Sequence, residues 1–351
     1  EQFSPEQSQQ LIQAILAQIE SVVLGKPQEC KLALACLLAQ GHLLIEDLPG
    51  MGKTTLAHML ATTLGLTYQR MQFTSDLLPA DVIGFSLFNN QDHSFELHKG
   101  PIFNQVVLAD EINRASPKTQ SALLEAMAEE QVSIDGTTYD LPEPFFVIAT
   151  QNPLFHSGTY PLPESQLDRF MMRLSLGFPD IEAEKKILLN HQGKNKTLTK
   201  TTAADVVIVN QNQLLAIQQG VLNVGVSNDV LDYIIALCQV SRSQYRNQSV
   251  HDNKTIHDSH SQNGTQGAHN IVCNPLSPRA SKALLSAAKA MAFIDNRDYV
   301  IPDDVQAVFY VVCQHRLEQG NSHDLIQSSQ TKNSIAQQIL NSVDVLNPFS
   351  Y

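Results

Sequence analysis

Short apolar runs alternate with helix-periodic stretches through the first half of the chain. The runs are five or six residues long, a length typical of buried strands. Helical stretches lie between several of them, which favours a parallel sheet covered on both faces. We therefore expect an α/β fold with strands at residues 42–46, 68–73, 105–110, 145–150 and 173–178.

The hydrophobic spacing changes near residue 180, after which helical patterns dominate. Apolar positions three and four apart recur in IEAEKKILLNHQ, SKALLSAAKAMAF and PDDVQAVFYVVCQHRLE. Upstream, residues 9–40 predict two helices that break at the tripeptide GKP, 25–27. We expect two domains: an αβα domain at 1–180, which includes these first helices, and a smaller all-helical domain at 181–351.

Residues 244–272 interrupt the helical domain with a segment rich in Ser, Asn, Gln, Gly and His. The segment has little apolar periodicity, so we expect an exposed, flexible insert. A metal site is the alternative interpretation, but the irregular spacing of the candidate ligands favours a solvated loop. Those ligands would be His251, Asp252, His257, Asp258, His260 and His269.

Composition narrows the classes of function. The chain has 351 residues, 43% of them apolar, and a formal charge of −12. This charge argues against nucleic acid and favours a basic protein or a polypeptide substrate. The five cysteines are scattered without a C-x-x-C pair, which indicates reduced thiols. No apolar run approaches the ~18 residues of a membrane span and the N-terminus has no secretory pattern, so we expect no membrane span and a cytoplasmic protein.

The stretch LPGMGKTT, at 48–55, indicates a phosphate-binding turn. In the pattern G-x-x-x-x-G-K-[ST], backbone N–H groups cradle phosphates, Lys reaches the β and γ oxygens, and Ser or Thr holds Mg²⁺. Asp47 stands where the pattern has its first glycine. An ordinary strand-to-helix turn is the alternative, but the strand before and the helix after supply the context that binds anions. The contacting residues would be Pro49, Gly50, Met51, Gly52, Lys53, Thr54 and Thr55.

Two carboxylates and one amide follow later strands. Asp110 and Glu111 come directly after QVVLA, and Asn152 closes FFVIATQN. Ligands of parallel α/β sheets bind at the carboxyl ends of the strands. Asp110 can therefore hold Mg²⁺, Glu111 can polarise a water that attacks the γ-phosphate, and Asn152 can orient that water. A solvent-facing acidic turn is the alternative for the Asp-Glu pair.

Longer segments resemble the MoxR family of AAA+ ATPases. The block GPIFNQVVLADEINRASPKTQSALLEAMAEEQVSIDG is highly specific, and the matches run in order from about residue 20 to residue 317. The family normally has an acidic residue at the position of Asp47. The other matching segments are EDLPGMGKTTLA, QFTSDLLPADVIG, FFVIATQNP, GTYPLPESQLDRFMMRL and SPRASKALLSAAKAMAFIDNRDYVIPDDV.

The resemblance implies an AAA+ P-loop core followed by a helical lid, with ATP and Mg²⁺ as cofactors. Lys53 would contact the β- and γ-phosphates, and Thr54 and Asp110 would serve Mg²⁺. Glu111 would activate water, and Asn152 matches the sensor-1 position.

Two arginines match positions that act on the γ-phosphate. Arg169, in LDRF, matches the arginine finger that a subunit offers to its neighbour, and Arg279, in SPRAS, matches the sensor-2 arginine of the lid. Either could instead form a structural ion pair, and Arg114 or Arg173 could occupy the interface position. Gly25 lies where the family lines the adenine.

Two projections are also expected. Residues 72–100 correspond to the family's insert in the second helix. Residues 132–141 independently predict a hairpin, with Asp135-Gly136 as its turn. By analogy with related ATPases, such projections face the ring pore or the substrate.

We therefore expect a Mg²⁺-dependent ATPase that assembles into a ring, expected to be hexameric, and remodels or matures partner protein complexes in a chaperone-like role. A protein with a von Willebrand factor A domain would be a common partner. One alternative is a nucleotide-gated scaffold with little turnover. Another is a DNA motor of the helicase branch, which the acidic charge disfavours.

Overall fold

A computed structural model describes residues 5–91, 93–152, 158–192, 209–254, 273–318 and 334–349. Its central sheet has five parallel strands in the order β2-β5-β8-β1-β9. Each strand overlaps one of the five apolar runs, which confirms the predicted parallel sheet. The last strand covers only 172–174 and not the expected 173–178, because the N–H groups of Leu176 and Gly177 donate to the Asp47 side chain and not to a neighbouring strand. The bounds of the five strands are β1 Leu43–Glu46, β2 Tyr68–Gln72, β5 Val106–Asp110, β8 Phe146–Gln151 and β9 Met172–Leu174.

The central strands are buried on both faces because their alternate side chains enter two different cores. Leu43 and Ile45 of β1 pack into one core, and Leu44 packs into the other. The residues of β5 and β8 divide in the same way. Burial on both faces explains why these strands are nearly continuous apolar runs in the sequence.

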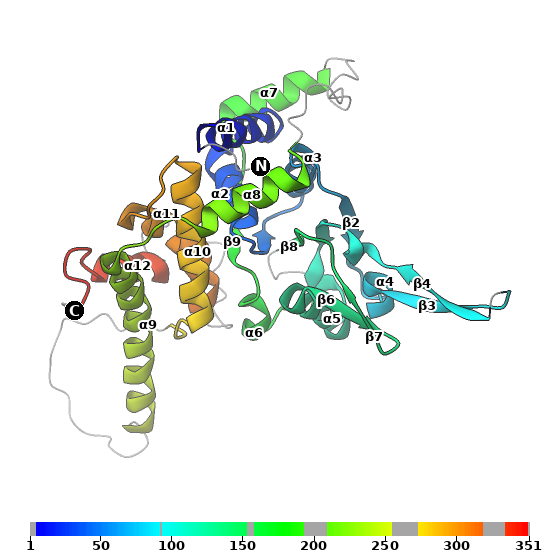
Figure 1. Cartoon of the computed structure of the whole chain (residues 1–351). Coiled ribbons are helices and arrows are strands. Elements are labelled where there is room, and N and C mark those ends of the chain that lie inside the picture. The colour runs from blue at the N-terminus through cyan, green and yellow to red at the C-terminus, as the bar shows by residue number, and fades with distance from the viewer. Residues whose placement is uncertain are drawn as a thin grey trace.

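Helices cover both faces of the sheet (Figure 1). The predicted GKP break separates the first two helices: Gly25 has a φ of 73°, and Pro27 begins the second helix, where its missing N–H costs nothing. The helices before β9 are α1 Pro5–Val22, α2 Pro27–Leu38, α3 Lys53–Thr63, α4 Pro79–Ile83, α5 Pro117–Glu129 and α6 Glu164–Leu167, with short 3₁₀ turns η1 Pro101–Phe103 and η2 Ile112–Arg114.

Two antiparallel hairpins extend the αβα core. Strands β3 (Gly84–Asn89) and β4 (Ser94–Lys99) form a long hairpin that projects away from the sheet (Figure 1). Strands β6 (Gln131–Ile134) and β7 (Thr137–Asp140) form the hairpin expected at 132–141. Its turn residues have positive φ angles, 50° at Asp135 and 81° at Gly136, as the Asp-Gly signal predicts.

Helices follow the last strand. Among the described residues after Leu174, the only β contact is an isolated bridge between Gly225 and Tyr299. Helix α10 packs against α2 and α11 packs against β9, so one of the two cores continues into the helical region. The helices are α7 Ile181–Gln192, α8 Gln211–Leu222, α9 Asn228–Lys254, α10 Pro278–Ile294, α11 Pro302–Leu317 and α12 Ile335–Ser342.

The expected insert at 244–272 begins later than predicted. Helix α9 continues to Lys254, so residues 244–254 are helical. The sequence of α9 contains neither Gly nor Pro, and a helix can extend into polar sequence when no such residue stops it. Residues 255–272, with three of the four candidate metal-ligand histidines, lie outside the described residues.

Within the described ranges, every helix is too short or too polar to cross a lipid bilayer.

His42 is buried and its side chain hydrogen-bonds both the sheet and the helix layer. Its Nδ1 accepts a hydrogen bond from the Val147 N–H at 3.1 Å, so the proton lies on Nε2, 3.0 Å from the Met127 carbonyl. Burial lowers the pKa of His42 to about 4. The folded protein therefore holds this imidazole neutral.

We expect acid to destabilise the protein through His42. Its folded pKa of about 4 lies below the unfolded value of about 6.5, so the contribution is complete above pH ~6.5 and falls progressively toward pH ~4. The lost free energy of unfolding reaches up to about 3 kcal/mol. Urea denaturation from pH 7.5 to 4.5 should show a shallower pH dependence for His42→Gln than for the wild type.

His98→Gln is the matched control, because His98 lies exposed on β4. It should keep the wild-type pH dependence. His315 is also buried and its pKa is lowered by burial, so the His42 variant should retain some slope. Parallel stability curves for the wild type and His42→Gln would contradict the assignment.

Candidate functional site

The turn between β1 and α3 leaves an open cradle at a helix N-terminus. Gly50 and Gly52 have φ angles of 86° and 89°, a region that favours glycine. A Cβ at either position would meet no atom within 4 Å, so the space beside the loop is open. Gly52 precedes α3 without a side-chain cap. Backbone N–H groups of the first turn can therefore bind an anion such as phosphate.

Asp47 anchors this loop to the end of β9. Its carboxylate accepts hydrogen bonds from Ser175 Oγ at 2.8 Å, from the Leu176 N–H, and from the Gly177 N–H at 3.3 Å. Asp47 is 7% exposed. The residue that departs from the general phosphate-loop pattern thus fixes the start of the loop in a way that a glycine could not.

Lys53 points along the loop toward the carboxyl ends of the strands. Its Nζ donates to the Asp47 carbonyl at 2.6 Å and to Asn152 Oδ1 at 3.1 Å. Burial lowers the pKa of Lys53, while the nearby carboxylates of Asp47, Asp110 and Glu111 oppose that shift. An anionic ligand in the cradle would favour the charged ammonium further.

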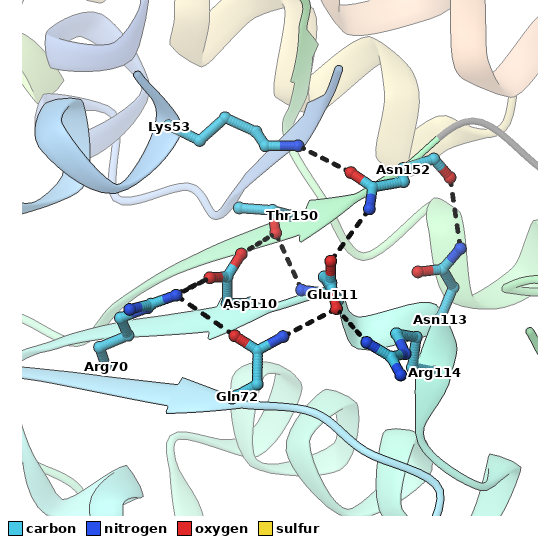
Figure 2. Close-up of polar contacts among 9 residues, drawn as sticks. All are labelled: Lys53, Arg70, Gln72, Asp110, Glu111, Asn113, Arg114, Thr150 and Asn152. Carbon is cyan, nitrogen blue, oxygen red and sulfur yellow. Dashed lines mark hydrogen bonds and ion pairs between the residues drawn. The ribbon is translucent and has the colours of Figure 1, made fainter. Parts of the chain in front are cut away.

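Asp110 lies at the end of β5 with both carboxylate oxygens engaged. Thr150 of β8 donates to Oδ1 at 2.6 Å. Arg70 of β2 donates to Oδ2 through Nε at 3.1 Å and Nη2 at 2.6 Å. This contact raises the pKa of the Arg70 guanidinium. Figure 2 shows Asp110 held between the two neighbouring strands.

Glu111 follows in the left-handed region, with φ 56° and ψ 50°. That backbone is uncommon for a residue other than glycine and is often found at functional sites. Its Oε1 accepts from Asn152 Nδ2 at 3.0 Å, and its Oε2 accepts from Gln72 Nε2 and from Arg114 Nη1, each at 2.8 Å. The strained backbone turns the carboxylate toward the amide that also contacts Lys53 (Figure 2).

These side chains border one open cleft of about 380 Å³. The structure brings together nine of the residues singled out from the sequence, together with Arg70 and Gln72. Met51 instead packs against the hydrophobic core. The lining residues are Pro49, Gly50, Gly52, Lys53, Thr54, Thr55, Arg70, Gln72, Asp110, Glu111 and Asn152.

Gly25 lies elsewhere, in the turn between α1 and α2. A Cβ there would come within 2.8 Å of the Ala183 Cβ at the start of α7. The glycine therefore permits close approach of these two segments. The expectation that it lines an adenine stays a prediction.

Three further residues of the site were not expected from the sequence: Arg70, Gln72 and Thr150. Arg70 and Gln72 are two residues apart on β2, on either side of the buried Met71, so they share one face of the strand. That alternation was a detectable signal. Thr150 places a polar hydroxyl inside the fully buried strand β8. The hydroxyl is satisfied there because it donates to Asp110 and accepts from the Glu111 N–H.

The donor set fits Mg²⁺ bound together with a phosphate ligand. Mg²⁺ prefers oxygen ligands and commonly takes one or two carboxylates plus substrate phosphates. Asp110 and Thr54 line the same cleft. The described residues contain no cluster of three or more His, Cys, Asp or Glu able to hold a metal, so a site made only of such side chains is not built here.

Arg169 and Arg279 both lie outside the residues that line this cleft. Arg169 follows α6, and its Nη1 donates to the Leu124 carbonyl at 2.8 Å. Arg279 Nη1 lies 3.9 Å from the Oδ2 atom of Asp168, and 56% of the Arg279 side chain is exposed. The sensor-2 candidate thus contacts Asp168, the residue before the arginine-finger candidate, and not the phosphate loop.

The two other arginines are paired within the chain. Arg173 bridges Glu46 at 3.2 Å and Glu318 at 2.6 Å, and only 14% of its side chain is exposed. Arg114 is 53% exposed but contacts Glu111 of its own site. Arg173 is therefore poorly placed to reach a neighbouring molecule.

The sequence is similar to known families and proteins over most of its length. Residues 42–172 match the ATPase family associated with various cellular activities (AAA), and residues 268–339 match the AAA lid domain. Chaperone MoxR1 of Mycobacterium tuberculosis is 36% identical over 87% of this chain and 75% of its own length. Protein MoxR of Paracoccus denitrificans is 30% identical over 86% of each chain. This chain belongs to the MoxR family of AAA+ ATPases.

Two further proteins are similar to this chain over most of its length. YeaC of Bacillus subtilis is 42% identical over 85% of this chain and 84% of its own. A crystal structure of a Cytophaga hutchinsonii protein, 35% identical, superposes with a TM-score of 0.79 over 97% of this chain and 96% of that chain. The AAA+ core with a helical lid, expected from the sequence, is therefore confirmed for this MoxR-family protein.

We expect Asp47→Ala to destabilise the MoxR-family core, because it removes the acceptor for three donors at the end of β9. Loss of hydrogen bonds to a buried charged group should lower the free energy of unfolding by about 2–3 kcal/mol. Asp47→Asn, which keeps an acceptor oxygen, should lose less. Urea denaturation at pH 7.5 measures both.

Asp140→Ala is the control for Asp47→Ala. Asp140 is exposed at the end of β7, so its loss should change the stability by no more than about 0.5 kcal/mol. Equal stabilities of Asp47→Ala and the wild type would show that the carboxylate does not anchor the loop.

Proposed function

We propose that this protein is a Mg²⁺-dependent ATPase whose hydrolysis drives remodelling or maturation of other protein complexes. One observation carries the catalytic part of the proposal. Lys53, Asn152 and Glu111 form a continuous hydrogen-bonded chain at the mouth of an uncapped helix N-terminus. Membership of an AAA ATPase family supports nucleotide hydrolysis at this place.

Each side chain has a role that follows from its position. Lys53 and the N–H groups of 50–54 would bind the phosphates. Asp110 and Thr54 would hold Mg²⁺, which neutralises charge on the phosphate oxygens. Glu111 would accept a proton from the attacking water, which Asn152 would orient.

The site as described contains no arginine finger from its own chain. Arg169 and Arg279 lie outside the cleft, and Arg279 is largely exposed. We infer that a second copy presents these two arginines to the γ-phosphate, in a ring expected to be hexameric. Arginine supplied by a neighbouring subunit stabilises charge in the transition state and contributes roughly 10³–10⁵ in rate.

The proposed client is a protein. A relative is named a chaperone, which supports client remodelling, and the formal charge of −12 disfavours nucleic acid. A von Willebrand factor A domain protein is the proposed partner. The β3–β4 hairpin, whose Phe88 and Phe95 are 50% and 74% exposed, is the proposed contact for a client segment.

We expect specific ATPase activity to rise with protein concentration, because the complete site needs two copies. Lys53→Ala should lose ATP binding, whereas Glu111→Gln and Arg169→Ala should bind ATP but hydrolyse it at least about 100-fold more slowly. Phosphate release and light-scattering mass, measured on the same samples, relate activity to assembly.

Mixing the two inactive variants provides the sharpest test. An Arg169→Ala subunit keeps its own Glu111, and a neighbouring Glu111→Gln subunit can supply Arg169. The mixture should therefore recover part of the activity, while Glu111→Gln mixed with Lys53→Ala should recover none. Absence of turnover in every assembled state would reject the ATPase proposal, and absence of recovery would reject the arginine in trans.

A further inference from the structure

Arg70 lies against Asp110, the carboxylate proposed to hold Mg²⁺. It is the cationic residue of β2, the edge strand beside β5. Its guanidinium donates two hydrogen bonds to a single oxygen, Oδ2 of Asp110. The Asp110 side chain is 11% exposed, and that of Arg70 is 50% exposed. A half-exposed cation thus covers a nearly buried carboxylate at the cleft.

The Arg70 guanidinium is also linked to the Glu111 carboxylate, through the side chain of Gln72. Arg70 Nη2 donates to Gln72 Oε1 at 3.3 Å, and Gln72 Nε2 donates to Glu111 Oε2 at 2.8 Å. Asp110 and Glu111 are adjacent, so two negative charges meet at one strand end. Positive charge and hydrogen-bond donors must compensate them when no metal is bound.

We propose that Arg70 is the positioning residue for the magnesium-binding carboxylate, supplying positive charge at Asp110 that Mg²⁺ replaces when it binds. The inference rests on the proposed ATPase function. Thr150 keeps hold of Oδ1, so Arg70 can leave Oδ2 without freeing the carboxylate to rotate. Half of the Arg70 side chain is exposed, so the guanidinium can move into solvent.

The exchange predicts opposite effects of Arg70 on two forms of ATP. Without metal, ATP is strongly anionic, and the Arg70 charge should strengthen its binding in the cleft. With Mg²⁺, the same charge competes for Asp110 and repels the ion. A residue that merely stabilises the fold would weaken both forms together.

The experiment measures the dissociation constants of a fluorescent, non-hydrolysable ATP analogue in EDTA and in saturating Mg²⁺. Their ratio, the EDTA value over the Mg²⁺ value, should rise about fivefold to tenfold in Arg70→Gln, an effect typical of losing one charge-assisted ion pair. Arg70→Lys keeps the charge but loses the pair of guanidinium donors. Its ratio should therefore lie between those of Arg70→Gln and the wild type.

Arg114→Gln is the matched control. Arg114 is similarly exposed, at 53%, and pairs with the neighbouring Glu111, so the variant loses the same charge beside a carboxylate that is not the proposed metal ligand. Its ratio should stay within about twofold of the wild type. Circular dichroism establishes that each variant is folded, and Arg70→Lys replaces Arg70→Gln if the latter is not.

The outcomes separate this inference from the proposed function. If the wild type binds the analogue and Lys53→Ala does not, but Arg70→Gln leaves the ratio unchanged, Arg70 is not exchanged for Mg²⁺ and the inference is overturned. If the wild type fails to bind the analogue under either condition, the ATPase proposal itself fails, and the inference fails with it.

Discussion

The register of the parallel strands β2, β5, β8 and β1 sets the geometry of the whole site. Gln72 lies opposite Asp110 across β2 and β5, and Glu46 lies opposite Gln151 across β1 and β8. All four strands therefore end at one edge of the sheet. A slip of one residue would exchange the two buried faces of a strand, which makes the register costly to change. Hydrophobic burial thus holds the polar groups within hydrogen-bonding distance.

Two adjacent carboxylates lie at that edge, and each of their oxygens accepts at least one hydrogen bond from a neighbouring side chain. Asp110 accepts hydrogen bonds from Thr150 and Arg70. Glu111 accepts one from the side-chain amide of Asn152, directly after β8, and two from donors on other elements. Donors fixed by secondary structure need little rearrangement when a ligand binds. The arrangement suits a reaction whose catalysis is mainly positioning and electrostatic stabilisation, as phosphoryl transfer is.

Much of this could be predicted from the sequence because the signals are local. Apolar runs predicted the strands, the GKT turn predicted the cradle, and Asp135-Gly136 predicted a hairpin turn. The roles of Arg70 and Gln72 were not predictable in the same way, because they depend on β2 lying beside β5, which no local pattern states. The length of α9 was missed because polar sequence can continue a helix without apolar periodicity.

The residues around Arg279 could also not be predicted from local sequence patterns. Its contact with Asp168 depends on how the helical region packs against the core. The sequence places Arg279 at the start of a helix, after Ser277, whose side chain caps that helix. Only the packing of α10 and α11 against α2 and β9 decides which surface this helix start faces.

Arg173 connects the sheet to the helical region through ion pairs. It joins Glu46, the residue before Asp47, to Glu318, which follows the last residue of α11. Both ion pairs are largely shielded from water, so salt screens them less than it would on the surface. Because Arg173 and Glu46 lie on neighbouring strands of the sheet, a rotation of the helical region against the sheet would pull on the Arg173–Glu318 bridge at the strand that leads into the phosphate loop.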